Sequence, residues 1–242
     1  MEGLDHSKRF DKFTSSQAYR LCASLKSGKP SAAFYKYIKE VKIAKFLGRR
    51  TKTSVNTKST KWGKLFEVVL FEKVGLQYSL NHVDTILHPE YGEFWSGTPD
   101  FKAVDKTAEI KCFEPLHFGN LVMALDTKDL EIIKKEEPEV FWQTISNSIL
   151  SGFDKTEIIA FMPYRSELEE VFKMIEETNF LERNNLNPSD YLYFNIDNIE
   201  DFPYLPDDSK VKNINTFEFV IPKEDKEFLT MRMIEASKLL IQ

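Results

Sequence analysis

The chain has 242 residues, of which 42% are hydrophobic and 29% charged, and its formal net charge at pH 7 is −5. This length can bury one sizeable core, and the composition is that of a folded globular protein rather than of a disordered one. The first residues contain no apolar signal segment, and no run approaches the roughly 20 apolar residues that span a bilayer, so we expect a cytoplasmic protein without a membrane span.

The cysteines and histidines exclude several metal centres. Cys22 and Cys112 are the two cysteines, and no Cys-x-x-Cys pair occurs. We therefore expect neither a zinc site nor an iron–sulfur cluster, and a reducing compartment fits this cysteine content. The four histidines show no spacing typical of metal ligands and are predicted to be structural or solvated; they are His6, His82, His88 and His117.

The charges are distributed unevenly along the chain. Residues 1–64 contain 16 Lys and Arg against 4 Asp and Glu, whereas residues 65–242 contain 17 against 34. This asymmetry indicates either a basic surface for a polyanion on an acidic body, or lysines that only solvate amphipathic helices. The pattern favours neither interpretation.

The N-terminal part is predicted to be helical. A Thr and Ser cluster precedes the periodic segment that ends at Leu21, which predicts a helix whose N-cap is Ser15 or Ser16. Apolar residues alternate with lysines from Ala32 to Leu47 in the manner of an amphipathic helix, and Gly48 follows it. Residues 51–60 are expected to form a polar, basic loop.

A second helix is predicted from a cap near Ser59 or Thr60 to Gly75. Glu67 lies in its most apolar stretch, where a carboxylate is costly unless it is paired or bound to a metal. The alternative is a glutamate at the helix edge that reaches water. Gly63, one turn earlier on the same face, would leave room for a substrate backbone.

Residues 97–115, GTPDFKAVDKTAEIKCFEP, have the pattern of a β-hairpin. Asp100 precedes one alternating run, residues 105–107 supply the turn, and residues 108–113 alternate again. Because residues two apart share a face of a strand, Glu109 and Lys111 are predicted to project together, with Ile110 and Cys112 on the other side.

This arrangement would bring Asp100, Glu109 and Lys111 into one volume. Two carboxylates and the backbone carbonyl of Ile110 are hard oxygen ligands that suit Mg²⁺ or Mn²⁺. A neighbouring lysine could orient or deprotonate a metal-bound water and stabilise charge on a phosphate. Surface hairpins also commonly carry Glu and Lys on a solvated face, so this triple alone does not establish a site.

The remaining elements are predicted from periodicity and punctuation. A helix over residues 141–152 places Gln143 and Asn147 together at i,i+4, and Gln143 could hydrogen-bond the metal water or a phosphate. The other predictions are a helix or linker over 118–140, a first strand and connection over 76–96, a buried strand over 156–162, a helix from a capping box at Ser166 to about Thr178, strands over 191–196 and 216–221, a surface excursion over 197–213 and an amphipathic helix over 223–241.

The order of these pieces resembles the PD-(D/E)XK nuclease superfamily and, within it, the lambda-type phage exonucleases (the YqaJ-like viral recombinase family). The resemblance covers roughly residues 9–164 and is carried by Thr14–Leu21, Trp62-Gly63-Lys64-x-x-Glu67, Thr98-Pro99-Asp100, Glu109-Ile110-Lys111-Cys112 and the helix of Gln143 followed by a strand. It implies a restriction-endonuclease-like α/β fold with a mixed central β-sheet flanked by helices. The single domain would comprise a basic helical part (1–75), a catalytic core (76–164) and a C-terminal elaboration (165–242).

The resemblance also implies roles for individual residues. Asp100 and Glu109 would be the metal carboxylates, the Ile110 carbonyl the third protein ligand and Lys111 the catalytic lysine. Glu67 would match the helix glutamate that binds the metal or its waters, and Gln143 the active-site glutamine. Arg9 and Ser16 would match the pocket that receives the 5′-phosphate of the trimmed strand.

The function that follows from the resemblance is a Mg²⁺-dependent deoxyribonuclease, a 5′–3′ exonuclease on linear duplex DNA in phage-type recombination. Family members are ring-shaped trimers that thread duplex DNA and work beside a single-strand annealing protein. The resemblance therefore implies a homotrimer and an annealing partner for this chain. Three alternatives stay open: a structure-specific or restriction-like endonuclease of the same fold, a RecB-like nuclease with an iron–sulfur cluster, which the two isolated cysteines oppose, and a non-catalytic relic that only binds DNA.

Overall fold

The computed structural model describes residues 9, 11–49, 51, 57–80, 85–177 and 179–241. The predictions for His6, His82, Thr178 and the middle of the 51–60 loop lie outside this part of the chain. None of the helices in the described ranges combines the length and the apolarity that crossing a lipid bilayer requires.

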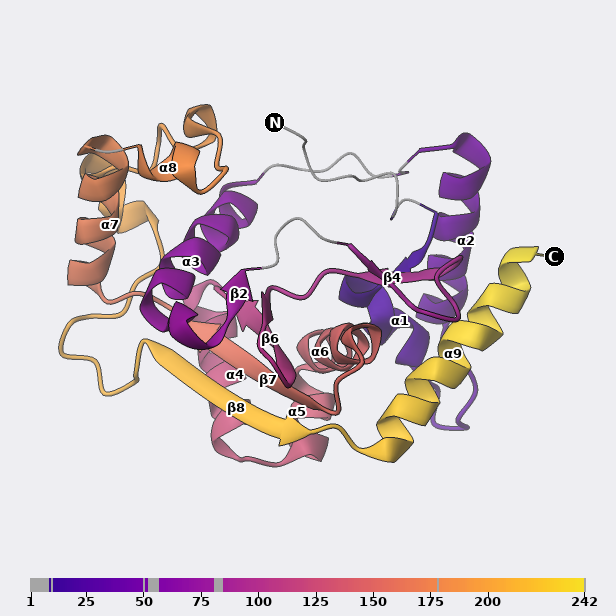
Figure 1. Ribbon diagram of the computed structural model, residues 1–242. Helices are drawn as coiled ribbons and strands as arrows, with labels where there is room; N and C mark the ends of the chain where they lie inside the picture. Colours follow the sequence, from indigo (N-terminus) through magenta and orange to yellow (C-terminus); the bar gives the residue numbers. More distant parts are fainter. Residues whose placement is uncertain are drawn as a thin grey trace.

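A mixed five-stranded sheet lies at the centre (Figure 1). Its strands, in spatial order, are β2 (Ser79–Leu80), β5 (Phe101–Lys102), β6 (Lys106–Lys111), β7 (Lys155–Phe161) and β8 (Ile214–Val220). Strands β6 and β7 run parallel, and the other neighbours are antiparallel. The predicted fold class, a mixed central sheet flanked by helices, is confirmed.

A second, three-stranded sheet joins the N-terminal segment to the chain that leads into Asp100. Strand β4 (Trp95–Gly97) pairs in parallel with β1 (Phe13–Thr14) and antiparallel with β3 (Ile86–Leu87). The register places Thr14 beside Ser96. Two segments more than 80 positions apart in the sequence therefore lie side by side.

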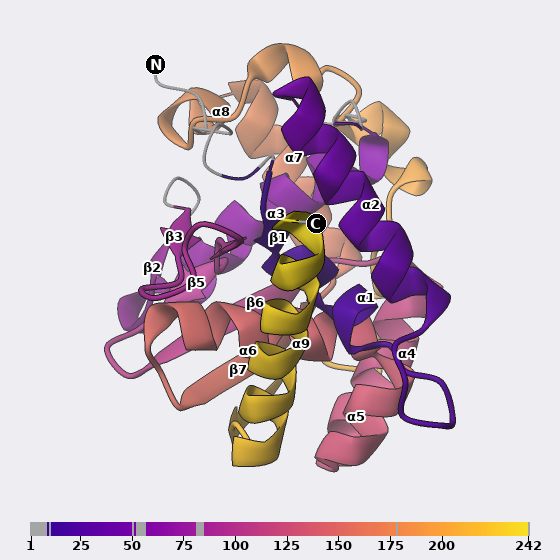
Figure 2. The same ribbon diagram turned by 90° about the vertical axis from the view of Figure 1, so that its right-hand side faces the viewer.

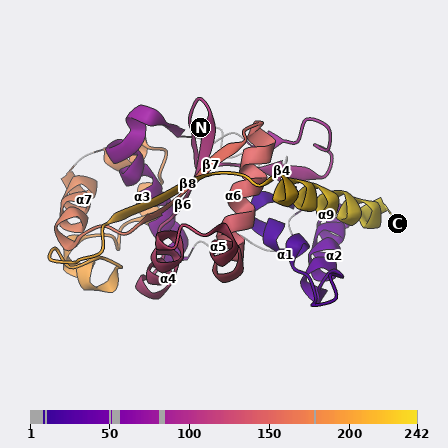
Figure 3. The same ribbon diagram turned by 90° about the horizontal axis from the view of Figure 1, so that it is seen from below.

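The helices cover both faces of the central sheet. They are α1 (Ala18–Cys22), α2 (Ala32–Leu47), α3 (Lys58–Val74), α4 (Pro115–Asp126), α5 (Leu130–Glu136), α6 (Pro138–Ser151), α7 (Arg165–Glu177), α8 (Phe180–Arg183) and α9 (Lys223–Ile241). Helix α9 packs against α1, α2 and α6, as Figure 2 shows from the side. Seen from below in Figure 3, α3 and α7 lie to one side of the molecule, and α6, α9, α1 and α2 lie to the other.

Strand β7 shows why the sheet has two buried faces. Ile158 and Ala160 belong to a core cluster with α1, α2, α6 and α9, whereas Ile159 and Phe161 belong to a second cluster with α3, α7 and α8. Because successive side chains of a strand point to opposite faces, a strand buried on both sides is apolar at nearly every position. This explains the continuous hydrophobic run by which the strand was predicted.

Several predicted elements are confirmed. They include the hairpin of β5 and β6, the helix Ala32–Leu47 with Gly48 at a φ of 64°, the strand β8 and the final helix. The helix predicted over 141–152 begins earlier, at Pro138, and ends at Ser151 before Gly152. The stretch 118–140 contributes most of α4 and all of α5.

The N-cap predicted at Ser15 or Ser16 is wrong. Residues 15–17 form a 3₁₀ turn, and α1 begins only at Ala18, without a side-chain cap from any described residue. The hydroxyl of Ser15 is instead buried and lies 2.8 Å from the Ser146 hydroxyl on α6. A tertiary hydrogen bond has replaced the local cap.

Two other helix starts differ by one to three residues from the prediction. Thr57, rather than Ser59 or Thr60, caps α3 by accepting a hydrogen bond from the Thr60 N–H at 3.1 Å. At α7, the Tyr164 N–H donates to the Glu167 carboxylate at 2.8 Å, and Ser166 lies inside the helix. A local capping hydrogen bond is therefore present at the N-terminus of α3 and of α7, but other residues form it than the sequence predicted.

The strand predicted over 191–196 is wrong. These residues are all described and form turns, with a 3₁₀ helix starting at Ile196. Tyr191 and Phe194 are buried in the second core cluster, where Phe194 packs on Phe172 and Phe202. Aromatic packing rather than a hydrogen-bonded ladder therefore fixes this segment, and the neighbouring 197–213 stretch is partly buried rather than a pure surface excursion.

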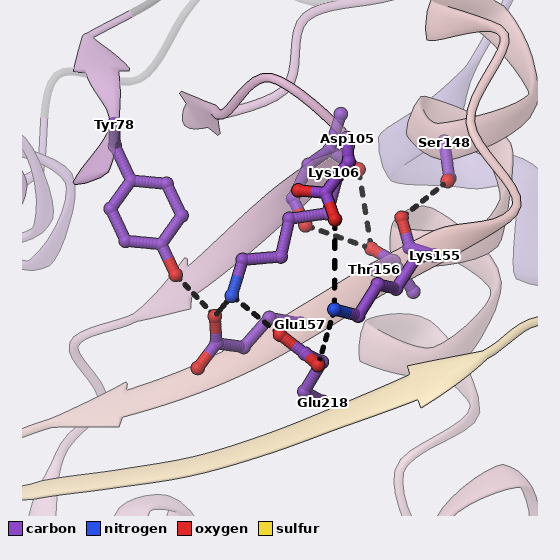
Figure 4. A network of polar contacts seen from close by, with 9 residues as sticks. Tyr78, Asp105, Lys106, Ser148, Lys155, Thr156, Glu157 and Glu218 are labelled. Carbon is purple, nitrogen blue, oxygen red and sulfur yellow. Dashed lines mark hydrogen bonds and ion pairs between the residues drawn. The ribbon is translucent and has the colours of Figure 1, made fainter.

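A polar network crosses the sheet at the start of β6 (Figure 4). The ammonium of Lys106 lies 2.7 Å from Glu157 and 2.6 Å from Glu218, and Lys155 lies 2.7 Å from Glu218. The Tyr78 hydroxyl donates to Glu157. Burial and the bond to Glu157 raise the pKa of Tyr78 to about 12. These side chains connect β6, β7 and β8 with the residue that precedes β2.

Candidate active site

Glu109 and Lys111 lie at the other end of β6, on one face of the strand. Glu109 is 1% exposed, and the Lys111 ammonium donates to its Oε1 at 3.0 Å. Ile110, between them, is buried in the core cluster on the opposite face. The alternation read from the sequence therefore describes the local geometry correctly.

Asp100 joins them because of the hairpin register. Phe101 pairs with Ala108 across the antiparallel β5–β6 ladder, which brings the preceding Asp100 beside Glu109 and Ile110. The Asp100 carboxylate accepts a hydrogen bond from the Ile110 N–H at 2.8 Å. The two strands thus deliver both carboxylates and the lysine to the same end of the hairpin.

Helix α6 supplies two amides to Glu109. The Gln143 amide N–H donates to Glu109 Oε1, and the Gln143 carbonyl accepts from Lys111 at 3.1 Å. One turn later, Asn147 donates to Glu109 Oε2 at 2.9 Å. The sequence showed Gln143 and Asn147 on one helix face, but a role was predicted only for Gln143. The i,i+4 spacing was the signal for Asn147.

Glu67 approaches from α3. Burial and the negative charge of Glu109 raise its pKa to about 7, while the charges of Lys111 and Lys64 oppose that rise. A carboxyl group responds to a neighbour in this way only when the two share a poorly solvated volume. The structure therefore places Glu67 within the electrostatic reach of the group formed by Asp100, Glu109 and Lys111.

The carboxylates of this site repel one another. Burial, followed by the charges of Glu109 and Glu67, raises the pKa of Asp100 well above its ordinary value, against the effects of Lys111 and the Ile110 N–H. Burial alone would lower the pKa of Lys111, but the charges of Glu109 and Asp100 raise it overall. Lys111 is therefore protonated, and its single positive charge does not offset the effect of burial and of the neighbouring carboxylates on the pKa of Asp100.

The donor set fits a divalent cation, although the side chains do not form a closed cage. Within the described ranges, no three His, Cys, Asp or Glu side chains have metal-holding geometry as they lie. The oxygens of Glu109 are engaged by Lys111, Gln143 and Asn147 instead. Carboxylates that repel one another are nonetheless the ligands that Mg²⁺ and Mn²⁺ prefer, and a cation would relieve the repulsion. Asp100, Glu109 and the Ile110 carbonyl stay the predicted ligands.

Arg9 and Ser16 lie on the N-terminal side of this site. Arg9 donates to the Thr98 hydroxyl at 3.4 Å, two residues before Asp100. The Ser16 hydroxyl lies 3.3 Å from that of Thr14, which is 3.3 Å from the Tyr37 hydroxyl. Burial raises the pKa of Tyr37, against hydrogen bonds from Thr14 and the charges of Arg20 and Arg9. The charge of Arg9 thus reaches the hydroxyl cluster that contains Ser16.

Solved structures with the same overall fold include two exonucleases. An alkaline exonuclease from Laribacter hongkongensis superposes with a TM-score of 0.57 and 14% identity, over 96% of this chain and 91% of its own. Its complex with dAMP gives a TM-score of 0.57 and 12% identity, over 97% and 92%. A phage-related exonuclease from Haemophilus somnus 129PT gives 0.59 and 16%, over 95% and 93%.

No family model and no curated protein matches the sequence. The similarity is therefore one of fold, spread over nearly the whole length of each chain. The chain has the α/β fold of these exonucleases, and the resemblance read from the sequence is confirmed at that level.

Proposed function

We propose that this protein is a metal-dependent deoxyribonuclease that degrades linear double-stranded DNA from its 5′ ends in phage-type homologous recombination. The observation that carries the proposal is the convergence of Asp100, Glu109 and Lys111, with Gln143 and Glu67 around them, in a chain with the fold of exonucleases. An excess of buried carboxylates beside one lysine is the arrangement that phosphodiester hydrolysis with a divalent cation needs.

The residues would divide the work as follows. Asp100, Glu109 and the Ile110 carbonyl would hold Mg²⁺ or Mn²⁺, with Glu67 through a water, and the bound cation would supply Lewis-acid chemistry and a more acidic water. Lys111, kept protonated by its carboxylate neighbours, would stabilise the negative charge that develops on the scissile phosphate. Gln143 would orient both Lys111 and Glu109, because it hydrogen-bonds to each.

Arg9 and Ser16 would bind the terminal 5′-phosphate. A guanidinium near the segment that carries Asp100, beside a group of hydroxyls, can supply charge and hydrogen bonds to a phosphate. The resemblance to lambda-type exonucleases further suggests a homotrimer that encloses the duplex and a single-strand annealing protein as partner. A closed ring would give processive degradation without tight binding.

This function is tested by a time course of DNA degradation with Mg²⁺. The substrates are linear duplex DNA with 5′-phosphate or 5′-hydroxyl ends and, in parallel, supercoiled circles. Loss of the linear DNA with intact circles, faster with the 5′-phosphate, is expected. Nicked or linearised circles would point to an endonuclease of the same fold. If neither Mg²⁺ nor Mn²⁺ supports cleavage, the proposal fails and a DNA-binding relic becomes the better account.

A further inference from the structure

We infer that Asn147 is a positioning residue that couples recognition of the DNA end to the carboxylate of Glu109. The inference rests on the proposed function, because it assigns Asn147 to the path between the predicted 5′-phosphate pocket and the predicted metal carboxylate. Neither the sequence pattern nor the similarity of fold gives Asn147 this role.

Hydrogen bonds that meet at Thr98 and at the Asn147 amide carry the inference. Arg9 donates to the Thr98 hydroxyl at 3.4 Å. The amide nitrogen of Asn147 donates to the Thr98 carbonyl at 3.4 Å and to Glu109 Oε2 at 2.9 Å. Thr98 therefore contacts Arg9 through its side chain and Asn147 through its backbone. A phosphate that displaces Arg9 would therefore also displace Thr98. The Thr98 carbonyl and Glu109 accept hydrogen bonds from the same Asn147 amide, so the displacement would reach Glu109.

Close packing at Gly97 leaves little room for slack in this connection. A Cβ added to Gly97 would lie 2.0 Å from the Ser15 hydroxyl and 2.5 Å from the Asn147 carbonyl oxygen. The Ser15 hydroxyl in turn contacts Ser146, the neighbour of Asn147 on α6, which also accepts a hydrogen bond from Trp95 at 2.9 Å. The N-terminal segment, β4 and α6 are thus held together on either side of Gly97.

The choice of asparagine carries a cost that core packing alone does not explain. Asn147 is 1% exposed, and its carbonyl oxygen is buried with no hydrogen-bond partner among the described residues. Both neighbours of its amide nitrogen are acceptors, so the orientation of the amide is defined. An unpaired buried carbonyl is destabilising. The donor to Thr98 and Glu109 is the feature that offsets this cost.

Gln143 provides a matched control within the same helix. It lies one turn before Asn147 and hydrogen-bonds the other oxygen of Glu109 and Lys111. In the described part of the chain, its side chain bonds to Glu109 and Lys111 and not to Thr98. Loss of Gln143 should disturb the carboxylate as much as loss of Asn147, while leaving the path from Arg9 intact.

The test is a double-mutant cycle of Arg9→Ala and Asn147→Ala, read as the ratio of single-turnover rates on 5′-phosphate and 5′-hydroxyl duplex ends. We expect Asn147→Ala to lower this ratio about tenfold, and the double variant to lower it little further, because residues in one hydrogen-bond network are not additive. Gln143→Ala should slow both substrates equally and combine additively with Arg9→Ala. An Asn147→Ala protein that keeps the wild-type ratio, or that is additive with Arg9→Ala, overturns the inference.

Thr98→Val is a second variant that avoids opening a cavity beside Glu109. It removes the hydroxyl that contacts Arg9 and keeps the carbonyl that contacts Asn147. We expect it to lower the ratio more than it lowers the rate on 5′-hydroxyl ends. Equal slowing of both substrates would contradict the coupling. Thermal melting of each variant shows whether it is folded.

Fluorescence anisotropy of labelled duplexes with Ca²⁺ in place of Mg²⁺ separates this inference from the proposed function. A wild-type protein that binds 5′-phosphate ends preferentially with Ca²⁺ but does not cleave DNA with Mg²⁺ contradicts the nuclease function. The double-mutant cycle of Arg9→Ala and Asn147→Ala is then measured on binding affinities, with the same outcomes expected. A wild-type protein that cleaves DNA but treats both ends equally supports the nuclease and overturns the coupling.

Discussion

The two ends of strand β6 contain the same kinds of side chain in opposite electrostatic states. At the first end, Lys106 lies between Glu157 and Glu218, and hydrogen bonds from Lys106 and Lys155 lower the pKa of Glu218. At the other end, the pKa values of Asp100 and Glu67 are raised. Lysine–carboxylate pairs hold the first end together, whereas burial and neighbouring carboxylates disfavour the ionised forms of Asp100 and Glu67 at the other end.

The difference shows that a cluster of Lys and Glu is not by itself an active site. What distinguishes the Lys111 end is that the pKa values of Asp100 and Glu67 are raised, since perturbed groups of this kind gather at functional sites. In the network of Figure 4, by contrast, Lys106 and Lys155 lower the pKa of Glu218, as expected of a carboxylate in a structural ion pair.

The largest expected effect comes from replacing the charged residues at the Lys111 end of β6 by alanine. Asp100→Ala, Glu109→Ala and Lys111→Ala should each reduce DNA cleavage at least roughly 10³-fold, because each removes a group that would bind the metal or stabilise the transition state. The measurement is the rate of nucleotide release from linear duplex DNA, with circular dichroism to check the fold. Substantial residual cleavage would contradict the assignment of the site.

Glu67 tests whether burial and a neighbouring carboxylate destabilise its ionised form. Its pKa rises from 4.5 in the unfolded reference to about 7 in the folded protein, so the folded state holds its proton more tightly. Stability should therefore fall as pH rises from about 4.5 to 7, with no loss below that range. Glu67→Gln should remove on the order of 2 kcal/mol of this loss, measured by urea unfolding without divalent metal at pH 5 and pH 8.

Adding Mg²⁺ should restore stability at pH 8 to the wild-type protein, because a cation relieves the repulsion. A Glu67→Gln protein whose pH profile matches that of the wild type would contradict the raised pKa of Glu67. The same experiment on Asp100→Asn serves as a control, since this variant should respond weakly to Mg²⁺.

Lys106 tests the other end of β6. Lys106→Ala should destabilise the protein by about 2 kcal/mol, because Glu157 would be left partly buried without its cation, with solvent screening reducing the full cost. The rate of cleavage should stay near that of the wild type. The measurements are chemical unfolding and the nuclease assay on the same preparation. A large loss of activity in a folded Lys106→Ala protein would contradict the assignment of a structural role to the Lys106 end of β6.

Tyr78 offers the smallest effect. Tyr78→Phe removes the hydrogen bond to Glu157 while Lys106 still pairs with that carboxylate, so a loss of about 1 kcal/mol is expected. Spectrophotometric titration should also lose one tyrosine of pKa about 12. Loss of a tyrosine that titrates near the ordinary value of 10 would contradict the raised pKa and the hydrogen bond to Glu157.

The sequence determined those features that depend on a few neighbouring residues. Alternation placed Glu109 and Lys111 on one face of β6, and periodicity with a following glycine gave the helix Ala32–Leu47 its bounds. Backbone geometry with a period of 2 or 3.6 decides such features locally. The choice of Asp100, Glu109 and Lys111 as site residues came from the same local pattern together with the resemblance.

Only the tertiary structure decided which distant segments meet. The Ser15 hydroxyl, expected to cap a helix, instead bonds Ser146, 131 positions away, and Asn147 reaches both Thr98 and Glu109. The residues over 191–196 have a strand-like composition, but they do not join a sheet. Tyr191 and Phe194 are instead buried by packing against each other and against other aromatic rings. Likewise, the raised pKa of Glu67 arises from burial and from Glu109 on another element. Such contacts depend on how whole elements pack against each other, and a local pattern of residue types does not contain that information.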